Sequence, residues 1–183
     1  MCGSPSPPVA TKTVPERIED VEIIVKASGV LVRIGGDRAF YSPASDSIQM
    51  PPDAAFTSPA ERAATVLHEL GHASGAKHRL NRDLSGKFGS SAYAREELRV
   101  EISSVLVGGA IGLPSDIPHH ASYLSSWLEI LKSDKREIFY ASADAQRIAD
   151  YILAFHPDYA ERLDEPEKVV DEDTSPVAAP LAA

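Results

Sequence analysis

The sequence of 183 residues predicts an α+β fold, in which a small sheet is accompanied by a mainly helical bundle. Two observations carry this prediction. Short segments rich in β-branched and aromatic residues, separated by turns, lie between residues 30 and 52. Apolar residues then recur at helical spacing in several segments between residues 58 and 155. One domain with its own hydrophobic core fits this length.

The sheet is expected to be a three-stranded antiparallel meander. Residues 30–34 are apolar enough for a buried strand, residues 38–42 form the second strand, and residues 47–50 form a short third strand. The turn Gly35-Gly36-Asp37 separates the first two strands, and Pro51-Pro52 closes the third. A helix precedes the sheet, since Pro15 suits a first helical turn and Gly29 suits a helix end.

The next helix is the most distinctive one. Its start is marked by Ser58-Pro59-Ala60-Glu61, a capping box with proline at the first helical position. Gly71 lies inside the helix, where glycine costs about 1 kcal/mol relative to alanine. A close approach of another backbone or side chain at Gly71 would explain that cost. Gly75 is the expected C-terminal cap.

Three further helices follow a polar loop over residues 76–91. The first begins near Ala92 and ends between Gly108 and Gly112. Residues 119–132 and 134–155 are expected to form the other two. The domain therefore spans residues 15–156, between a disordered leader over residues 1–14 and an acidic, Pro- and Ala-rich disordered tail over residues 157–183.

Composition excludes several classes of function. The net charge is −9, and residues 164–173 hold six acids against one Lys, so no basic face for nucleic acid is indicated. No apolar run could span a bilayer, and the leader has no signal-peptide core. Cys2 is the only cysteine, which rules out an internal disulfide and a thiolate metal site and fits a reducing cytoplasm.

The motif His68-Glu69-Leu70-Gly71-His72 predicts a metal centre. Two histidines four residues apart on a helix point the same way, so both imidazoles can reach one Zn²⁺ ion. The Glu69 carboxylate can then take a proton from water activated by that ion. This arrangement predicts a zinc metallopeptidase with Glu69 as general base.

A catalytic zinc usually has three protein ligands, and two residues are candidates for the third. Glu97 lies at the edge of the apolar stripe of its helix and Glu101 in its middle, so both carboxylates need a partner. A metal for Glu97, and the N–H of a ligand histidine for Glu101, would satisfy both. Glu96 is expected to point to solvent.

His78 is the alternative third ligand. The chain reads His68-Glu69-x-x-His72-x-x-Gly75-x-x-His78, which matches the longer metzincin signature. Metzincins also have a methionine turn after the motif, whereas the only methionines here, Met1 and Met50, precede it. The pattern therefore favours Glu97 over His78.

Hydrolysis also needs a donor for the developing oxyanion. Tyr123 is the first choice, and the other candidates are Tyr93, His119, His120 and Arg79. A peptide substrate is expected to lie along an edge strand beside the motif helix, near residues 40–41 or 47–50.

Beyond the motif, the chain resembles the zincin-like metallopeptidase domain of the ArdC/TraC antirestriction and conjugative-primase family. The similar segments span roughly residues 16–156 in the same order and spacing. They are Phe40-Tyr41-Ser42-Pro43, Asp46 to Pro52, Thr65 to His72 with Gly75, Arg79-Leu80-Asn81-Arg82, Phe88-Gly89, Tyr93 to Leu98 with Glu101, Ala121 to Leu124 with Trp127, and Asp134-Lys135-Arg136.

The resemblance implies a gluzincin-like ligand set of His68, His72 and Glu97, and a mobile genetic element as the context. Family members often carry an N-terminal domain that binds single-stranded DNA, and this chain starts too late to include one, so we expect either a shorter relative or a fragment that begins near the metallopeptidase domain. We therefore expect a peptide or protein substrate and no direct nucleic-acid or membrane partner, while the oligomeric state is not indicated. The alternative is a non-catalytic metal-containing domain that binds and counters a host protein.

Overall fold

The computed structural model describes residues 12–87, 89–113 and 124–164, and within them the chain is α+β, as predicted. The elements are α1 (Val14–Ala27), β1 (Leu31–Ile34), β2 (Phe40–Ser42), β3 (Ser47–Met50), the short 3-10 helix η1 (Asp53–Ala55), α2 (Pro59–Ala73), α3 (Ser91–Ile111), α4 (Leu124–Ser133), α5 (Glu137–Leu153) and α6 (Pro157–Asp164). None of the described helices is long and apolar enough to cross a membrane.

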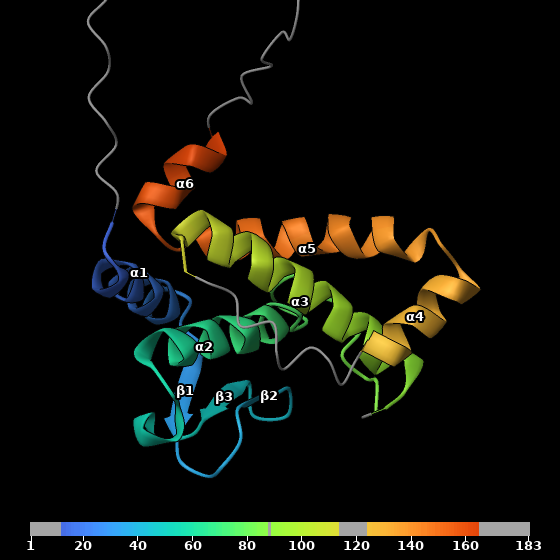
Figure 1. Cartoon of the computed structure of the whole chain (residues 1–183), viewed down its shortest axis with the longest axis horizontal. Helices are drawn as coiled ribbons and strands as arrows, with labels where there is room; N and C mark the ends of the chain where they lie inside the picture. Colours follow the sequence, from blue (N-terminus) through green and yellow to red (C-terminus); the bar gives the residue numbers. More distant parts are fainter. Residues whose placement is uncertain (1–11, 88, 114–123, 165–183) are drawn as a thin grey trace, which may run out of the picture.

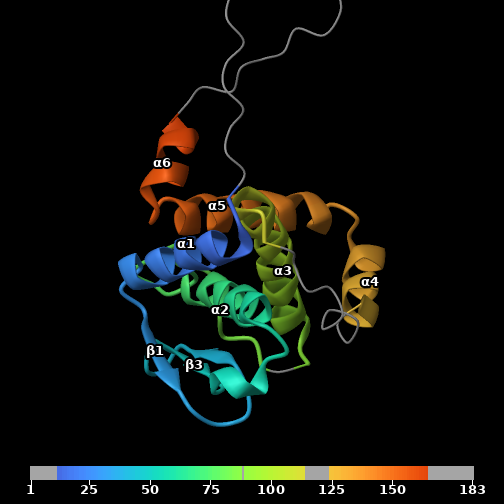
Figure 2. The ribbon, with the colours of Figure 1, turned by 60° about the vertical axis from the view of Figure 1, so that its left-hand side comes forward.

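Helix α2 lies at the centre of the molecule, between the sheet and the other helices (Figures 1 and 2). It packs on β2 and β3 with one side and on α1, α3 and α5 with the others. The core is built from fully buried side chains of these elements, among them Ile24, Ile48, Met50, Leu70 and Ile152. Burying such apolar side chains provides most of the favourable free energy of folding.

Side-chain caps fix where the helices begin. The Thr13 backbone N–H and hydroxyl both donate to the Glu16 carboxylate at the start of α1. The Ser58 hydroxyl accepts from the backbone N–H of Glu61 at the start of α2, while the Glu61 carboxylate accepts from Thr57. The predicted start of α2 is therefore confirmed, and α1 begins one residue before Pro15, whereas α5 begins at Glu137 rather than at residue 134. The capping residues satisfy N–H groups that have no partner inside the helix.

The sheet is mixed, so the predicted antiparallel meander is wrong both in the order of the strands and in the direction of β1. Strand β3 lies in the middle, antiparallel to β2 and parallel to β1. The prediction paired β1 with β2 across Gly35-Gly36, but residues 35–39 instead carry the chain past β3. Gly35 stays beside β3, where its N–H donates to Met50 O over 2.9 Å.

Strand β1 was also wrongly expected to be buried. It is an edge strand, and Leu31 and Ile34 are about half exposed, at 53% and 55%. Strand β2, which begins at Phe40 rather than Arg38, forms the opposite edge. That edge faces the motif helix.

The C-terminal part differs from the prediction in extent. Helix α4 begins at Leu124 in the described part of the chain, and residues 119–123 of its predicted span lie outside it. The first eight residues of the expected tail form helix α6, which buries Tyr159 in the core. The rest of the tail and residues 1–11 of the leader also lie outside the described residues.

Candidate metal centre

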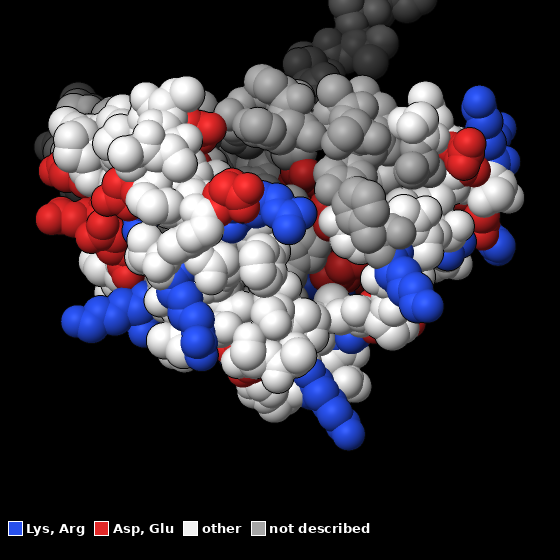
Figure 3. Space-filling view, turned by 90° about the horizontal axis from the view of Figure 1, so that it is seen from below, with Lys and Arg blue, Asp and Glu red and all other residues white. Residues whose placement is uncertain are grey.

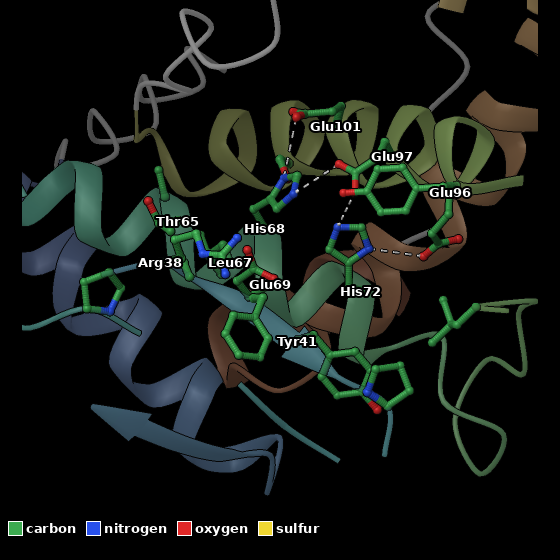
Figure 4. Close-up of a pocket in the computed structure, with 18 of the residues that line it drawn as sticks. Arg38, Tyr41, Thr65, Leu67, His68, Glu69, His72, Glu96, Glu97 and Glu101 are labelled. Atoms are coloured by element: carbon green, nitrogen blue, oxygen red, sulfur yellow. Dashed lines mark ion pairs between the residues drawn. The ribbon is translucent and has the colours of Figure 1, made fainter. Parts of the chain in front are cut away.

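His68 and His72 project from α2 toward α3 and face one glutamate there (Figure 4). Nε2 of His68 lies 3.8 Å from Glu97 Oε2, and Nε2 of His72 lies 3.4 Å from Glu97 Oε1. The two imidazole rings meet edge to face, with centroids 4.9 Å apart. The three residues form the one group of at least three His, Cys, Asp or Glu side chains in the described chain that could hold a metal ion.

The spacing of these atoms fits a small divalent cation. One ligand atom from each residue lies within 4.8 Å of the others. Atoms bound at about 2.0–2.2 Å around a tetrahedral zinc are separated by roughly 3.4 Å. One of the two N–O distances, from His72, equals that value, and the other, from His68, is longer, at 3.8 Å. A set of two imidazoles and one carboxylate is also typical of a catalytic zinc site, with a fourth position open.

Each histidine has a second carboxylate on its other ring nitrogen. Nδ1 of His68 lies 3.8 Å from Glu101 Oε1, and Nδ1 of His72 lies 3.5 Å from Glu96 Oε1. A carboxylate at Nδ1 holds the proton there and leaves Nε2 free to bind a metal. Glu101 lies beside Nδ1 of His68, the atom it was predicted to accept from, at 3.8 Å rather than at hydrogen-bond distance.

The prediction that Glu96 points to solvent is wrong. Glu96 is 7% exposed and makes a two-point ion pair with Arg82, over 2.7 and 3.1 Å. The prediction assumed that α3 buries one apolar face. The helix instead packs on α2, α4 and α5 and is buried on several sides. Val105, which lies two turns after Leu98 on the same face of α3, is 50% exposed. The basic residue in the polar loop, Arg82, was the signal that could have revealed a buried partner.

Four glutamates are buried at this centre, namely Glu69, Glu96, Glu97 and Glu101. Arg82 compensates one of them. His68 and His72 face Glu97 and Glu101, and four carboxylates gathered in one buried place remain costly unless positive charge balances them. The surplus of buried negative charge therefore independently favours a bound cation.

The electrostatics of Glu69 differ from those of its neighbours. Burial raises the pKa of Glu69, although His72 and the backbone N–H of Tyr41 partly offset this. Burial also acts to raise the pKa of Glu96, but hydrogen bonds with His72 and Arg82 hold it below its usual value. Glu69 is thus the carboxyl group better suited to accept and return a proton near neutral pH.

Strand β2 is fixed beside the motif by a polar cluster. The Tyr41 hydroxyl donates to Asp46 over 2.7 Å, and Arg79 binds the same carboxylate with both Nη atoms and Ala73 O with Nη1. His78 belongs to this cluster, with Nε2 3.4 Å from Asp46 Oδ2. The structure therefore places Glu97, and not His78, at the two motif histidines.

A cavity of about 790 Å³ opens over the centre. Its wall includes Phe40 and Tyr41 of β2, Tyr93 and Ser104 of α3, and Phe56. Figure 3 shows this face hollowed near its middle, with acidic side chains inside and Lys and Arg side chains projecting around it. The space is sufficient for an extended peptide segment beside β2.

The predicted oxyanion donors fall in different places. Tyr93 lines the cavity. Arg79 is engaged by Asp46 and Ala73, as described above. Tyr123, His119 and His120 lie outside the described residues.

A family model described as zincin-like metallopeptidase matches residues 19–144. The chain belongs to this family. It is 49% identical over 144 residues to the uncharacterized protein y4eC of Sinorhizobium fredii, a match that covers 78% of this chain and 47% of y4eC. It is also 49% identical over 139 residues to a DNA primase TraC of Escherichia coli, covering 75% of this chain and 10% of that protein.

Solved structures of the antirestriction protein ArdC from plasmid R388 share the fold. The Mn(II)-bound structure matches with a TM-score of 0.70 and 37% identity, covering 84% of this chain and 57% of that one. The metal-free structure matches with a TM-score of 0.68 and 38% identity, covering 84% of this chain and 53% of that one. The resemblance to the ArdC/TraC family is therefore confirmed, and the chain spans about half the length of y4eC and ArdC and about a tenth of TraC.

Proposed function

We propose that this chain is a zinc-dependent peptidase in which His68, His72 and Glu97 hold the metal and Glu69 is the general base. The single observation that carries the proposal is the convergence of His68, His72 and Glu97 at the floor of a cavity that Glu69 and an edge strand also line. A cation held there would polarise a peptide carbonyl and make a water molecule more acidic.

The chain's own residues would do the rest. The Glu69 carboxylate would take the proton from the attacking water and return it to the leaving nitrogen. Tyr93 in the cavity wall and Tyr123 are our candidates for stabilising the oxyanion. The outer edge of β2, on which the backbone N–H of Tyr41 donates to Glu69, would bind the substrate backbone as an added strand, with Phe40 and Tyr41 at the contact.

We place this activity in the cytoplasm of cells that carry mobile genetic elements. The named functions of the relatives, antirestriction for ArdC and DNA priming for TraC, support that context. The proposed substrate is a host protein that acts against incoming DNA, presented to the cavity as an extended segment.

The test is hydrolysis of unfolded casein by the zinc-loaded chain and its Glu69→Gln variant. We expect the variant to keep its zinc and to lose about 10²–10⁴-fold in rate, since that is the usual contribution of a general base. Glu22→Gln on the exposed side of α1 serves as the matched control and should behave as the parent chain.

Equal rates for the parent and Glu69→Gln would remove Glu69 from the mechanism. If the zinc-loaded parent cleaved neither casein nor a mixed peptide library, the peptidase proposal would fail. A non-catalytic domain that binds a host protein would then be the better account of the same metal centre.

A further inference from the structure

Arg82 lies in the loop after α2, and its side chain contacts residues of α2 and α3 next to the candidate metal ligands. Its side chain is only 11% exposed. Nη2 donates to Gly71 O over 2.8 Å, Nη1 donates to the Ser74 hydroxyl over 2.8 Å, and Nε and Nη2 hold Glu96. One guanidinium thus joins the C-terminal turn of α2 to α3.

These contacts extend to a candidate metal ligand. The Glu96 oxygen that accepts the 2.7 Å bond from Arg82 is Oε1, and the same oxygen lies 3.5 Å from Nδ1 of His72. With a proton on Nδ1, His72 presents Nε2 to Glu97. Arg82 therefore acts on His72 through Glu96 and through Gly71, which precedes His72 in the motif.

The geometry requires arginine and not merely a positive charge. The planar guanidinium meets the two Glu96 oxygens and two acceptors on α2 at once. A lysine ammonium is a point charge that cannot reproduce such a fork. Loss of Arg82 would also leave the Glu96 carboxylate buried without its cation, so that this side chain would move or become protonated.

We propose that Arg82 is a positioning residue, which holds Glu96 against His72 and thereby sets the orientation of that imidazole for metal binding. The inference rests on the metal centre of the proposed function but not on peptide hydrolysis. It adds a residue outside the His-Glu-x-x-His motif to the requirements for metal affinity.

The experiment measures Zn²⁺ and Mn²⁺ affinity by competition with a chelator for the full chain and its Arg82→Gln and Arg82→Lys variants. Loss of a residue that orients a metal ligand typically weakens affinity by about 10–100-fold, and we expect this for Arg82→Gln. Arg82→Lys should recover only part of the loss. Long-range ¹H–¹⁵N spectra of the metal-free chain should show a changed tautomer of His72 in Arg82→Gln.

Arg99→Gln is the matched control. Arg99 is also a largely buried arginine, and it pairs with Asp144 and Glu137 on the α5 side of α3. Its loss should lower stability without weakening metal affinity more than about threefold, a margin below the usual effect of an orienting partner. Equal losses of affinity in Arg99→Gln and Arg82→Gln would reduce Arg82 to a general structural role and overturn the inference.

The double variant Arg82→Gln/Glu96→Gln protects the test against misfolding, because it leaves no buried charge unpaired. The single variant Glu96→Gln is measured beside it. If Arg82 and Glu96 act as one unit, the metal affinity of the double variant should be no weaker than that of the weaker of Arg82→Gln and Glu96→Gln. Additive losses, or parental affinity in Arg82→Gln, would contradict the inference. Absence of metal binding by the parent chain would overturn both this inference and the proposed function, whereas metal binding without hydrolysis would defeat only the peptidase proposal.

Discussion

Single residues decide which enzyme group the metal centre resembles. Glu97 is 3% exposed and faces both motif histidines, while the His78 side chain is 64% exposed and faces Asp46. We expect Glu97→Ala to lower zinc affinity by more than about 100-fold, beyond the usual effect of losing an orienting partner. His78→Ala should retain the parental affinity. Metal content after dialysis, measured by mass spectrometry, checks both.

The opposite result, with zinc lost from His78→Ala and kept by Glu97→Ala, would assign the site to the metzincin arrangement.

Glu101→Gln should have an effect on zinc affinity between those of Glu97→Ala and His78→Ala. It keeps the shape of the side chain near Nδ1 of His68 but removes its charge. A loss of about 10–100-fold would match a carboxylate that orients a ligand without binding the metal itself.

At the scale of elements, the contact between α2 and α3 sets the spacing of the ligands. A Cβ atom at Gly71 would lie 2.8 Å from Val100 Cγ1, so the close approach predicted for this glycine is confirmed. Val100 is fully buried and β-branched, which leaves it little freedom to move aside.

Gly71→Ala is therefore expected to push the two helices apart. Overpacking costs about 1–3 kcal/mol, whereas replacing glycine within a helix returns about 1 kcal/mol. We expect a net loss of about 1 kcal/mol in the free energy of unfolding, measured by urea denaturation, together with weaker zinc binding. A more stable Gly71→Ala chain with parental zinc affinity would show that α3 can shift without cost.

Val100→Ala tests the cause of that loss. It opens space opposite position 71, so the double variant Gly71→Ala/Val100→Ala should be more stable than the sum of the two single changes predicts. Strict additivity would mean that the strain at Gly71→Ala arises elsewhere.

At the scale of the whole molecule, one buried polar cluster joins the two ends of the described chain. Asp20 of α1 accepts hydrogen bonds from Lys12 and from the Tyr159 hydroxyl, and His156 Nε2 lies 3.2 Å from it. Figures 1 and 2 show α6 beside α1, on the side away from the sheet. The cluster holds α6 on the domain and extends the core beyond the predicted boundary at residue 156.

Stability should fall at alkaline pH because of this cluster. Burial, together with the hydrogen bond to Asp20, raises the pKa of Tyr159 to about 12. An unfolded tyrosine titrates near 10, so the contribution is full below about pH 10 and is lost as the pH rises toward 12. Two pH units correspond to at most about 3 kcal/mol.

Urea denaturation at pH 8, 10 and 11.5 would measure this effect. Tyr159→Phe should lower the free energy of unfolding by about 1–2 kcal/mol at pH 8, because it leaves Asp20 one donor short. It should also show a smaller decline than the parent between pH 10 and 11.5. Identical declines in the two chains would exclude Tyr159 as the titrating group.

The sequence by itself determined the features that depend on local chemistry. The helix cap at Ser58, the helical spacing of His68 and His72, and the need for a close neighbour at Gly71 all follow from residues a few positions apart. The position of Glu97 at the edge of the apolar stripe made it a candidate ligand, the family likeness supported that choice, and the structure places it at the same two histidines.

Only the tertiary structure decided what depends on residues distant in sequence. The central place of β3, the burial of Glu96, the return of Arg82 to α2 and the docking of α6 all need contacts that no local pattern encodes. Strand order depends on which edge offers free hydrogen-bonding groups, and a helix wheel cannot anticipate a helix packed on several sides. The motif therefore indicated a metal centre, whereas the packing of α3 on α2 placed Glu96 and Glu97 beside His72.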